Sequence, residues 1–503
     1  MVDHRRSHCR HVPGGGVSLS LVRAARSRRD LSTALVIQLA VRVVGIAGGI
    51  AVAAGLARGL GHEQFGQFSL MLLLLSIAIN VGDLGLTTTV VRQLTVRPDA
   101  EASIVGALVV ARSMTGLLGA AFVAIGFAVL EPAPDARLVA VLGAATLLLM
   151  PLSSLQTVGQ AKLHVQAQNA LLLMQSILWT TAVIVLAATH ASLLAFGIAF
   201  CAVNVVQSVV TWAMFRRLAP PSFAAVWSTL RPILMIAAPV ALGGLFVASY
   251  YRAGGVVLYA FRGAGEAADY SAGARVLDIL QVVPATLLSV VLPLLSSTWR
   301  DDSPAARERR SRLFALALKS VMLAAVPIAV GGALLSSSLS VLVYGNEFAS
   351  SGPVLAVLLL SFPAICAGYV ATGLALACGR TGLFCAIAAC VAAVTIPVNL
   401  LVVPVGGASA TAWVTVIAEY AVAIVTFAAL RRGTGVSFPF AAWARTLVAA
   451  GVMALAVLPL RDAPVVLSVL VGAIVFAIAG LAVRAVTLED LRLLADRRER
   501  EWA

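Results

Sequence analysis

Residues 34–57 read ALVIQLAVRVVGIAGGIAVAAGLA, and this stretch decides the class of the fold. About 20 apolar residues in a helix are needed to cross the hydrocarbon core of a bilayer. The stretch exceeds that length and contains a single charged residue, Arg42. It is also too long for the apolar region of a cleavable signal peptide, so we expect it to be retained. Residues 34–57 therefore predict a membrane-spanning helix.

The composition extends this prediction to the whole chain. Of the 503 residues, 60% are hydrophobic and 12% are charged, with a mean hydropathy of +0.99. A soluble domain has about 25% charged residues, so this chain has too little polar surface to cover itself in water. Apolar runs between charged or turn-rich clusters predict an all-α polytopic membrane protein with about fourteen transmembrane helices, at 34–57, 66–91, 103–130, 138–160, 169–189, 192–215, 232–260, 270–298, 313–336, 352–378, 382–403, 408–430, 442–460 and 464–486.

The basic residues indicate how the chain is oriented. The net charge is +14, but the Lys and Arg residues are not clustered with aromatic residues, which argues against nucleic-acid binding. They recur in alternate loops, as the excess of positive charge on the cytoplasmic side of membrane proteins requires. With a cytoplasmic N-terminus, the loops on the outer side receive only Arg58, Arg137, Arg262 and Arg461. We therefore expect a multi-pass protein of the cell inner membrane with both termini in the cytoplasm.

Two short stretches look like copies of each other. Residues 60–66 (LGHEQFG) precede the second predicted span, and residues 263–271 (GAGEAADYS) precede the eighth. Each has a glycine turn, an acidic residue, an aromatic residue and a small residue that opens a helix. Because the copies are six spans apart, they predict two homologous six-helix lobes, as in duplicated transporter folds.

The sequence resembles the Wzx-type polysaccharide flippases of the multidrug/oligosaccharidyl-lipid/polysaccharide (MOP) exporter superfamily. The resemblance covers roughly residues 32–430, and its motifs occur in register with the predicted spans. The residues that carry it are 57–68 (ARGLGHEQFGQF), 82–86 (GDLGL), 270–276 (YSAGARV), 342–348 (LVYGNEF) and 406–412 (GGASATA).

The resemblance implies an architecture and a way of working. Two six-helix lobes would face each other in a V, with a central cavity lined mainly by spans 1, 2, 7 and 8, and the protein would work by alternating access. The expected parts are a basic cytoplasmic tail (1–31), an N-lobe with helices 1–6 (32–217), a C-lobe with helices 7–12 (218–432), extra helices 13 and 14 (433–486), and a cytoplasmic amphipathic tail (487–503).

Three charged residues fall inside the spans of the first lobe, at similar depth. Arg42, Asp83 and Arg112 each lie eight or nine residues from a span end, which places them roughly 12–14 Å above the inner face. A charge at this depth is costly and calls for a function or a partner. Because the family places spans 1 and 2 side by side, we expect Arg42 to pair with Asp83 and Arg112 to remain in excess. The pair has either a structural role or a role in substrate binding.

A second charged layer is predicted in the other lobe. Arg252 lies on span 7, while Arg275 and Asp278 lie three residues apart on span 8 and so share a helix face. Tyr250, Tyr251 and Tyr270 lie at the same level, where an interfacial aromatic belt is the alternative interpretation. Both layers together suggest a positive interior, which suits a lipid pyrophosphate because Arg binds phosphate through a planar fork. Candidate substrate-binding residues are thus Arg42, Asp83, Arg112, Arg252, Arg275 and Asp278.

Glu419 lies near the middle of span 12 without a cationic neighbour in the sequence. Buried carboxylates in transporters exchange protons or bind Na⁺, which makes Glu419 a candidate ion-coupling residue. The alternative is a neutral glutamate that is hydrogen-bonded between helices.

The resulting functional hypothesis is a transporter without covalent chemistry. It flips an undecaprenyl diphosphate-linked oligosaccharide from the cytoplasmic to the outer leaflet for cell-surface polysaccharide biosynthesis. Its expected partners are that lipid-linked sugar and the membrane lipids, with a polysaccharide polymerase and glycosyltransferases as candidates. The alternatives are a cation-coupled multidrug exporter of the same superfamily, which needs an acidic cavity, and a membrane enzyme of lipid-linked sugar assembly, which needs a larger extramembrane loop. The sequence has no nucleotide-binding motif or metal-binding pattern, and no cofactor is expected.

Overall fold

The computed structural model describes residues 28–485, apart from 84, 132, 219, 225, 299–302, 435 and 437. All regular structure in these residues is helical, which confirms the predicted all-α fold. The chain divides into two compact units, residues 1–46 and 47–503. The described part of the first unit is the start of helix α2, and every other helix belongs to the second unit. The predicted amphipathic tail (487–503) and most of the predicted basic tail (1–31) lie outside the described residues.

Eleven helical segments of the described chain are long and apolar enough to cross a membrane. Three of them, Val44–Val96, Leu242–Leu288 and Gly382–Arg431, have 53, 47 and 50 residues. Each is about twice the length that one crossing requires. Each also contains a glycine with non-helical φ and ψ, at which the helix direction changes. Two crossings by each of the three would give fourteen, so the count of fourteen stays a prediction.

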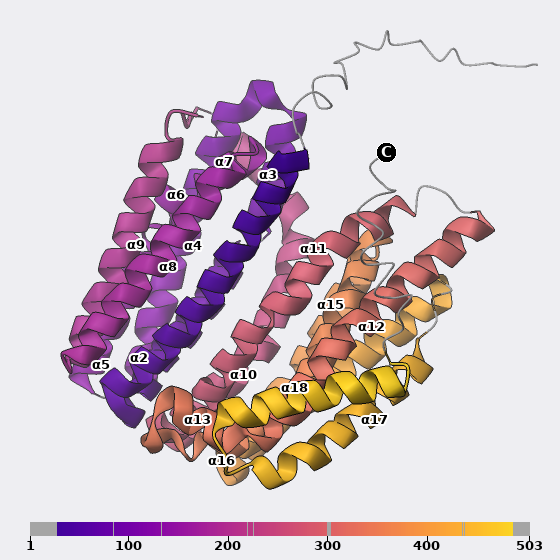
Figure 1. Ribbon diagram of the computed structural model, residues 1–503. Helices are drawn as coiled ribbons and strands as arrows, with labels where there is room; N and C mark the ends of the chain where they lie inside the picture. The colour runs from indigo at the N-terminus through magenta and orange to yellow at the C-terminus, as the bar shows by residue number, and fades with distance from the viewer. Residues whose placement is uncertain are drawn as a thin grey trace, which may run out of the picture. The chain divides into compact units, whose positions relative to one another are not determined.

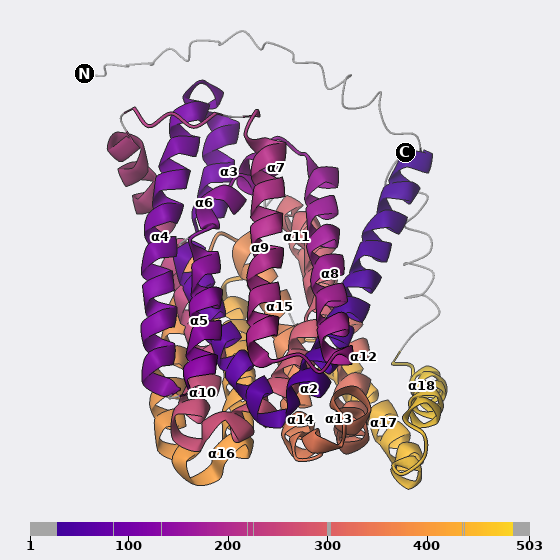
Figure 2. The ribbon, with the colours of Figure 1, turned by 90° about the vertical axis from the view of Figure 1, so that its left-hand side faces the viewer.

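The first group of helices occupies the chain up to residue 215. In order these are α2 (Arg28–Asp83), α3 (Leu86–Val96), α4 (Glu101–Leu130), α5 (Pro134–Leu147), α6 (Met150–Ser153), α7 (Gln156–Ala161), α8 (Val165–Ala188) and α9 (Leu193–Phe215), with a short 3₁₀ turn η1 (Pro98–Ala100). Helix α4 packs on α5, α5 on α9, and α9 on α8 (Figure 2). Large aromatic side chains fill the core of this group, among them Phe68, Phe127 and Phe196, which are almost fully buried.

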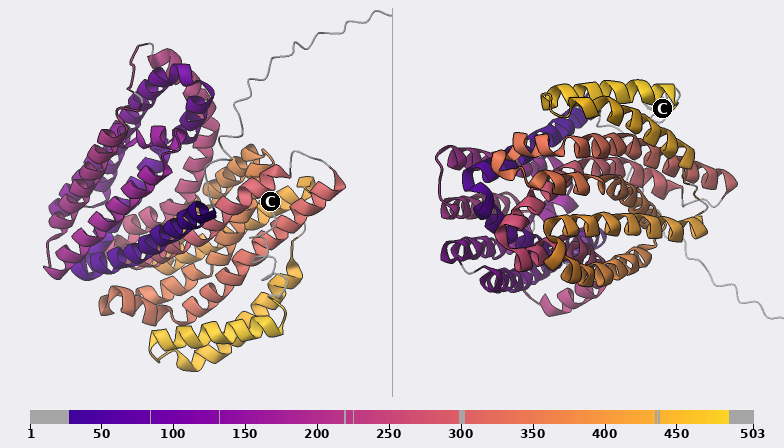
Figure 3. Two further views of the ribbon diagram at one scale, coloured as in Figure 1. Left: turned by 45° about the horizontal axis from the view of Figure 1, so that its top comes forward. Right: turned by 90° about the horizontal axis from the view of Figure 1, so that it is seen from below.

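The second group follows and is larger. Its helices are α10 (Val226–Leu280), α11 (Val282–Ser297), α12 (Pro304–Leu334), α13 (Ser336–Tyr344), α14 (Ser351–Leu359), α15 (Phe362–Ala377) and α16 (Thr381–Thr434), with the 3₁₀ turn η2 (Asn346–Phe348). Helix α10 packs on α14 and α16, and α15 packs on α11, α12 and α16. The last helices, α17 (Phe440–Val457) and α18 (Val465–Ala482), are joined by the turn η3 (Leu458–Leu460). Helix α18 packs on α17 and α17 on α12, so the pair lies along the margin of the second group (Figures 1 and 3).

The internal repeat appears in the backbone. Helix α2 bends at Gly61, with φ 73° and ψ 176°, and helix α10 bends at Gly263, with φ 80° and ψ −172°. A positive φ of this kind is easily adopted only by glycine. The two glycines belong to the two sequence copies and divide helices of 56 and 55 residues. The shared conformation supports the interpretation of the copies as a structural duplication.

The two glycine bends meet, and we call their meeting place the turn contact (His62, Phe65, Gly66, Ala264, Asp269, Phe348 and Ser350). His62 Nε2 lies 2.9 Å from Asp269 Oδ1, and the Ser350 hydroxyl donates to the same oxygen at 2.8 Å. The Phe65 ring packs edge-on against Phe348, with ring centroids 5.2 Å apart. A side chain on Gly66 would clash with the Ala264 carbonyl, so the two backbones touch directly. The turn contact therefore holds the first and second groups together at one end.

Candidate functional site

A pocket of about 150 Å³ lies between helices α2 and α10, and we call it the arginine pocket. Its polar lining comes from both groups of helices and includes Ser69, Ser76, Tyr251, Arg252, Tyr270, Ser271, Arg275, Asp278 and Thr415. The structure therefore brings the predicted second charged layer together around one small space. Tyr251 and Tyr270 also face this space, which favours the site over the aromatic-belt interpretation for these two residues.

Arg252 and Asp278 form a closed ion pair within the arginine pocket. The guanidinium donates to the two carboxylate oxygens at 3.1 and 3.4 Å. The Tyr251 hydroxyl donates to Asp278 at 3.0 Å, and Gln281 in turn donates to Tyr251 at 2.6 Å. Asp278 and Arg275 both line the pocket, and the ion-pair partner of Asp278 is Arg252 on the other arm of α10. Both charges are thus largely compensated within the protein.

Arg275 is the arginine of this layer that keeps its charge available. Its guanidinium lies over the Phe65 ring, 5.3 Å from the centroid, which holds it by a cation–π contact. In the described part of the chain no carboxylate lies within ion-pair distance of it. The hydroxyls of Ser69 and Ser271 also line the pocket, are buried, and have no hydrogen-bond partner there. One cation and two unpartnered hydroxyls make the pocket suitable for a small anion.

A second, larger space of about 770 Å³ begins about one helical turn further along α2, where Ile79 and Asn80 follow Ser76, and we call it the polar cavity. It is lined by helices α2 to α9 with Gly244 of α10, and its polar side chains are Asn80, Asp83, Thr87, Thr88, Arg112, Thr146, Ser153, Ser154, Gln156, Thr157, Gln160, Gln168, Asn204, Gln207 and Ser208. Breaks between α2 and α3 and between α5, α6 and α7 bring these residues to its wall. Irregular backbone at membrane depth is tolerated where it lines such a space.

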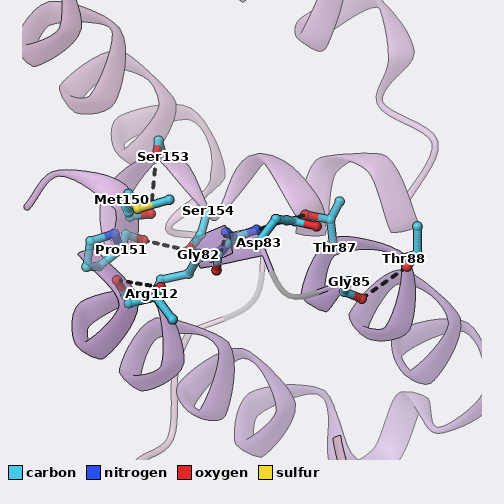
Figure 4. A network of polar contacts seen from close by, with 11 residues as sticks. Gly82, Asp83, Gly85, Thr87, Thr88, Arg112, Met150, Pro151, Ser153 and Ser154 are labelled. Atoms are coloured by element: carbon cyan, nitrogen blue, oxygen red, sulfur yellow. Dashed lines mark hydrogen bonds and ion pairs between the residues drawn. The ribbon is translucent and has the colours of Figure 1, made fainter. Parts of the chain in front are cut away.

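Asp83 and Arg112 form an ion pair at the wall of the polar cavity (Figure 4). Arg112 also donates to the Gly82 carbonyl at 3.1 Å and to the Thr87 hydroxyl at 2.9 Å. Because α2 ends at Asp83, the Gly82 carbonyl lacks a helical partner, and the guanidinium caps it. The prediction that Arg112 would remain in excess is therefore wrong. Helix α2 ends at Asp83, within reach of Arg112 on α4, and the predicted span boundaries did not reveal this end.

This pairing predicts unequal effects for its two members. Arg112→Ala leaves the Gly82 carbonyl uncapped and a carboxylate at a helix C-terminus, whereas Asp83→Ala leaves Arg112 with two of its acceptors. We expect Arg112→Ala to lower the free energy of unfolding more. The loss should stay below the ~3–5 kcal/mol of a fully buried pair, because the Asp83 side chain is 38% exposed. Thermal unfolding of the purified single and double variants measures the effects. A larger loss for Asp83→Ala would contradict the capping role.

Two other candidates remain predictions. Arg42 lies in the helical part of α2, but its side chain is outside what the structure describes, so the Arg42–Asp83 pair is untested. Glu419 is buried in α16, with 6% of its surface exposed, and interacts with Tyr250 of α10. No Lys or Arg of the described chain forms an ion pair with Glu419. This environment suits the neutral, hydrogen-bonded glutamate as well as an ion-coupling one.

The sequence interpretation missed the uncharged part of the site. It followed charged residues, whereas the polar cavity is lined mainly by amides and hydroxyls. A signal was present, because Gln156, Gln160, Asn204 and Gln207 lie within two of the predicted spans, at helical spacings of four and three.

Comparisons with known proteins agree with this architecture. Residues 31–299, more than half of the chain, match the sequence model of a family described as "Polysaccharide biosynthesis protein". No curated protein matches the sequence significantly. Among solved structures, "Lipid II flippase MurJ, inward closed conformation" is similar with a TM-score of 0.70 and 13% identity, over 89% of this chain and 98% of that one.

A second solved structure is similar over most of the chain. It is the "Inward-facing conformation of a multidrug resistance MATE family transporter of the MOP superfamily", with a TM-score of 0.63 and 14% identity, over 80% of this chain and 98% of that one. At these identities the likeness concerns the fold.

Proposed function

Because this chain belongs to the polysaccharide biosynthesis protein family, we propose that it flips a lipid-linked saccharide across the membrane. The proposed cargo is an undecaprenyl diphosphate-linked oligosaccharide, which moves from the cytoplasmic to the outer leaflet. The observation that carries the proposal is the guanidinium of Arg275 in the arginine pocket, which has no carboxylate partner among the described residues. Beside it lie the buried hydroxyls of Ser69 and Ser271, which likewise have no hydrogen-bond partner in the described chain. Guanidinium and hydroxyl donors together bind phosphate oxygens through charge-assisted hydrogen bonds.

The arrangement of acids favours this cargo over a cationic drug. A drug-binding cavity of the multidrug type needs a carboxylate that is free to attract a cation. Asp83 and Asp278, the acids that line the two spaces, are each paired with an arginine. The free charge of the arginine pocket is therefore positive, which attracts an anion.

The turn contact supplies one half of an alternating-access cycle. It closes the protein at the end where Gly61 and Gly263 lie, on one side of the arginine pocket. For a head group to leave on that side, His62 and Asp269 have to separate and Phe65 has to withdraw from Phe348. We propose that head-group transfer alternates between this closed arrangement and one in which the turn contact is open.

Reconstitution tests the proposed function directly. Purified protein is inserted into vesicles that contain a fluorescent undecaprenyl diphosphate disaccharide, and a membrane-impermeant quencher reports which leaflet holds the probe. We expect the protein to equilibrate the probe between leaflets, while protein-free vesicles keep it on one side. Equal rates with and without protein would contradict the proposal. A fluorescent phosphatidylcholine serves as the control lipid and should stay in its leaflet.

The proposed orientation, with both termini in the cytoplasm of the cell and the protein in its inner membrane, has its own test. Pro134 lies at the start of α5 and Arg217 follows α9, and both are exposed. In a variant without native cysteines, Pro134→Cys should react with an impermeant thiol reagent in intact spheroplasts. Arg217→Cys should react only after lysis. The reverse pattern would invert the topology.

Further parts of the proposal concern coupling and partners. Glu419 is the proposed ion-coupling residue, because it is buried and lacks a cationic partner in the described chain. A polysaccharide polymerase and glycosyltransferases that use the same lipid carrier are the proposed protein partners.

A further inference from the structure

The polar cavity is chemically different from the arginine pocket. Among the described residues, its charged lining side chains are Asp83 and Arg112, and these are paired with each other. The rest of its polar lining consists of hydroxyls and amides. Within the described chain, the side-chain amides of Gln156, Gln160 and Gln207 make no hydrogen bond to another residue. Polar groups at membrane depth need a partner, so this wall is built for water or for a ligand rich in hydrogen-bonding groups.

The two spaces are neighbours along one face of α2. Ser69, Leu72 and Ser76 line the arginine pocket, and Ile79, Asn80 and Asp83 continue the same stripe into the polar cavity. Ser76 and Asn80 are four residues apart, which corresponds to about 6 Å along a helix. A single ligand with one group in the arginine pocket can therefore place a covalently attached group in the polar cavity.

The volumes of the two spaces indicate which part of a ligand each of them can hold. The arginine pocket, at about 150 Å³, has the volume of about five waters. It holds a phosphate group but not a chain of sugars. The polar cavity, at about 770 Å³, lies within the range of about 300–1,000 Å³ that is typical of small-molecule sites.

We infer that the polar cavity is a subsite for an uncharged saccharide and selects against acidic sugars. The inference rests on the proposed function, because it takes the diphosphate in the arginine pocket as the anchor. Unpaired amides and hydroxyls match the alternating donors and acceptors of sugar hydroxyls and N-acetyl groups. A sugar carboxylate, in contrast, would lose its hydration and meet no free cation among the described lining residues, since Arg112 is committed to Asp83, Gly82 and Thr87.

Binding of three synthetic probes to the purified protein tests the inference. The probes share one polyprenyl diphosphate and differ in the head: no sugar, a neutral N-acetylhexosamine disaccharide, or a disaccharide that ends in a hexuronic acid. We expect the neutral probe to bind at least about 10-fold more tightly than the other two. Equal affinity for all three, or a preference for the uronate probe, would overturn the subsite.

Variants separate the subsite from its anchor. Gln156→Met/Gln207→Met removes two unpartnered amides at similar volume and should abolish the advantage of the neutral probe without changing the affinity for the bare diphosphate. Gln207→Lys should improve binding of the uronate probe. Arg275→Ala should weaken all three probes alike. If Arg275→Ala binds all three probes as the wild type does, while the double variant loses the preference for the neutral probe, the phosphate anchor is refuted and the subsite stands. If the double variant keeps the wild-type preference for the neutral probe, the subsite alone is refuted.

Discussion

Replacement of Arg275 by alanine is expected to reduce flipping of the diphosphate-linked probe in vesicles by about 100-fold or more. Each hydrogen bond to a charged group contributes roughly 1.5–3 kcal/mol, and the guanidinium can make two with a phosphate. Lysine at this position should restore only part of the rate, because it keeps the charge and loses the bidentate fork. The initial rate of probe transfer is the measurement.

Two control variants show whether the loss of flipping is specific to Arg275. Arg461→Ala removes an exposed arginine next to Asp462 and should leave the rate unchanged. Arg252→Ala should behave differently from Arg275→Ala, because it strands the Asp278 carboxylate and should therefore lower thermal stability as well as transport. Normal flipping by a well-folded Arg275→Ala protein would rule out its role as the phosphate anchor.

Gly66→Ala should open the turn contact. The added Cβ would overlap the Ala264 carbonyl oxygen and lie 2.8 Å from the carbonyl carbon, and these backbone atoms cannot move aside as a flexible side chain would. The two groups of helices then have to separate at this end, which should lengthen the distance between spin labels at the exposed positions Gln64 and Ala349 by several ångströms. Transport should be lost as well, because the closed half of the cycle is no longer accessible.

The same turn offers a matched control for this change. A Cβ on Gly265 would meet the His62 ring at 3.6 Å, an ordinary van der Waals contact. Gly265→Ala should therefore leave both the label distance and transport unchanged. If Gly66→Ala kept the distance distribution of the wild type, the direct backbone contact would not be what holds the turn contact closed.

The fold was predictable because its signal is local. Apolar segments of sufficient length are stable in the hydrocarbon core of the bilayer. The glycine turns at Gly61 and Gly263 can be recognised because their sequences are copies of each other. The precise pairing of charges was not predictable from spacing. Asp278 lies three residues from Arg275 on α10, yet it pairs with Arg252, which reaches it from the other arm of the bent helix. Pairing between helices depends on their rotation and tilt, and the sequence carries neither directly.

Breaks between helices explain the remaining difference between the predicted spans and the observed helices. The segment 138–160 was predicted as one span, and the structure divides it into α5, α6 and α7. Such breaks turn neighbouring residues such as Ser153 and Gln156 toward the polar cavity. Their positions depend on packing against α4 and α9 as well as on Pro151, so a reading of hydropathy alone joins the three helices.

The internal pairing of Arg112 with Asp83 and of Arg252 with Asp278 has an electrical consequence. These pairs carry no net charge through the membrane field. Of the described residues that line the two spaces, Arg275 then remains as the charge on which the field acts together with the cargo. A diphosphate diester bears about two negative charges, one for each phosphate, which leaves a net charge of about −1 when Arg275 accompanies it. A potential of 100 mV, negative inside, would then favour outward movement by about 2.3 kcal/mol. Flipping in vesicles should accordingly accelerate when a potassium diffusion potential of that sign is imposed and slow when the potential is reversed.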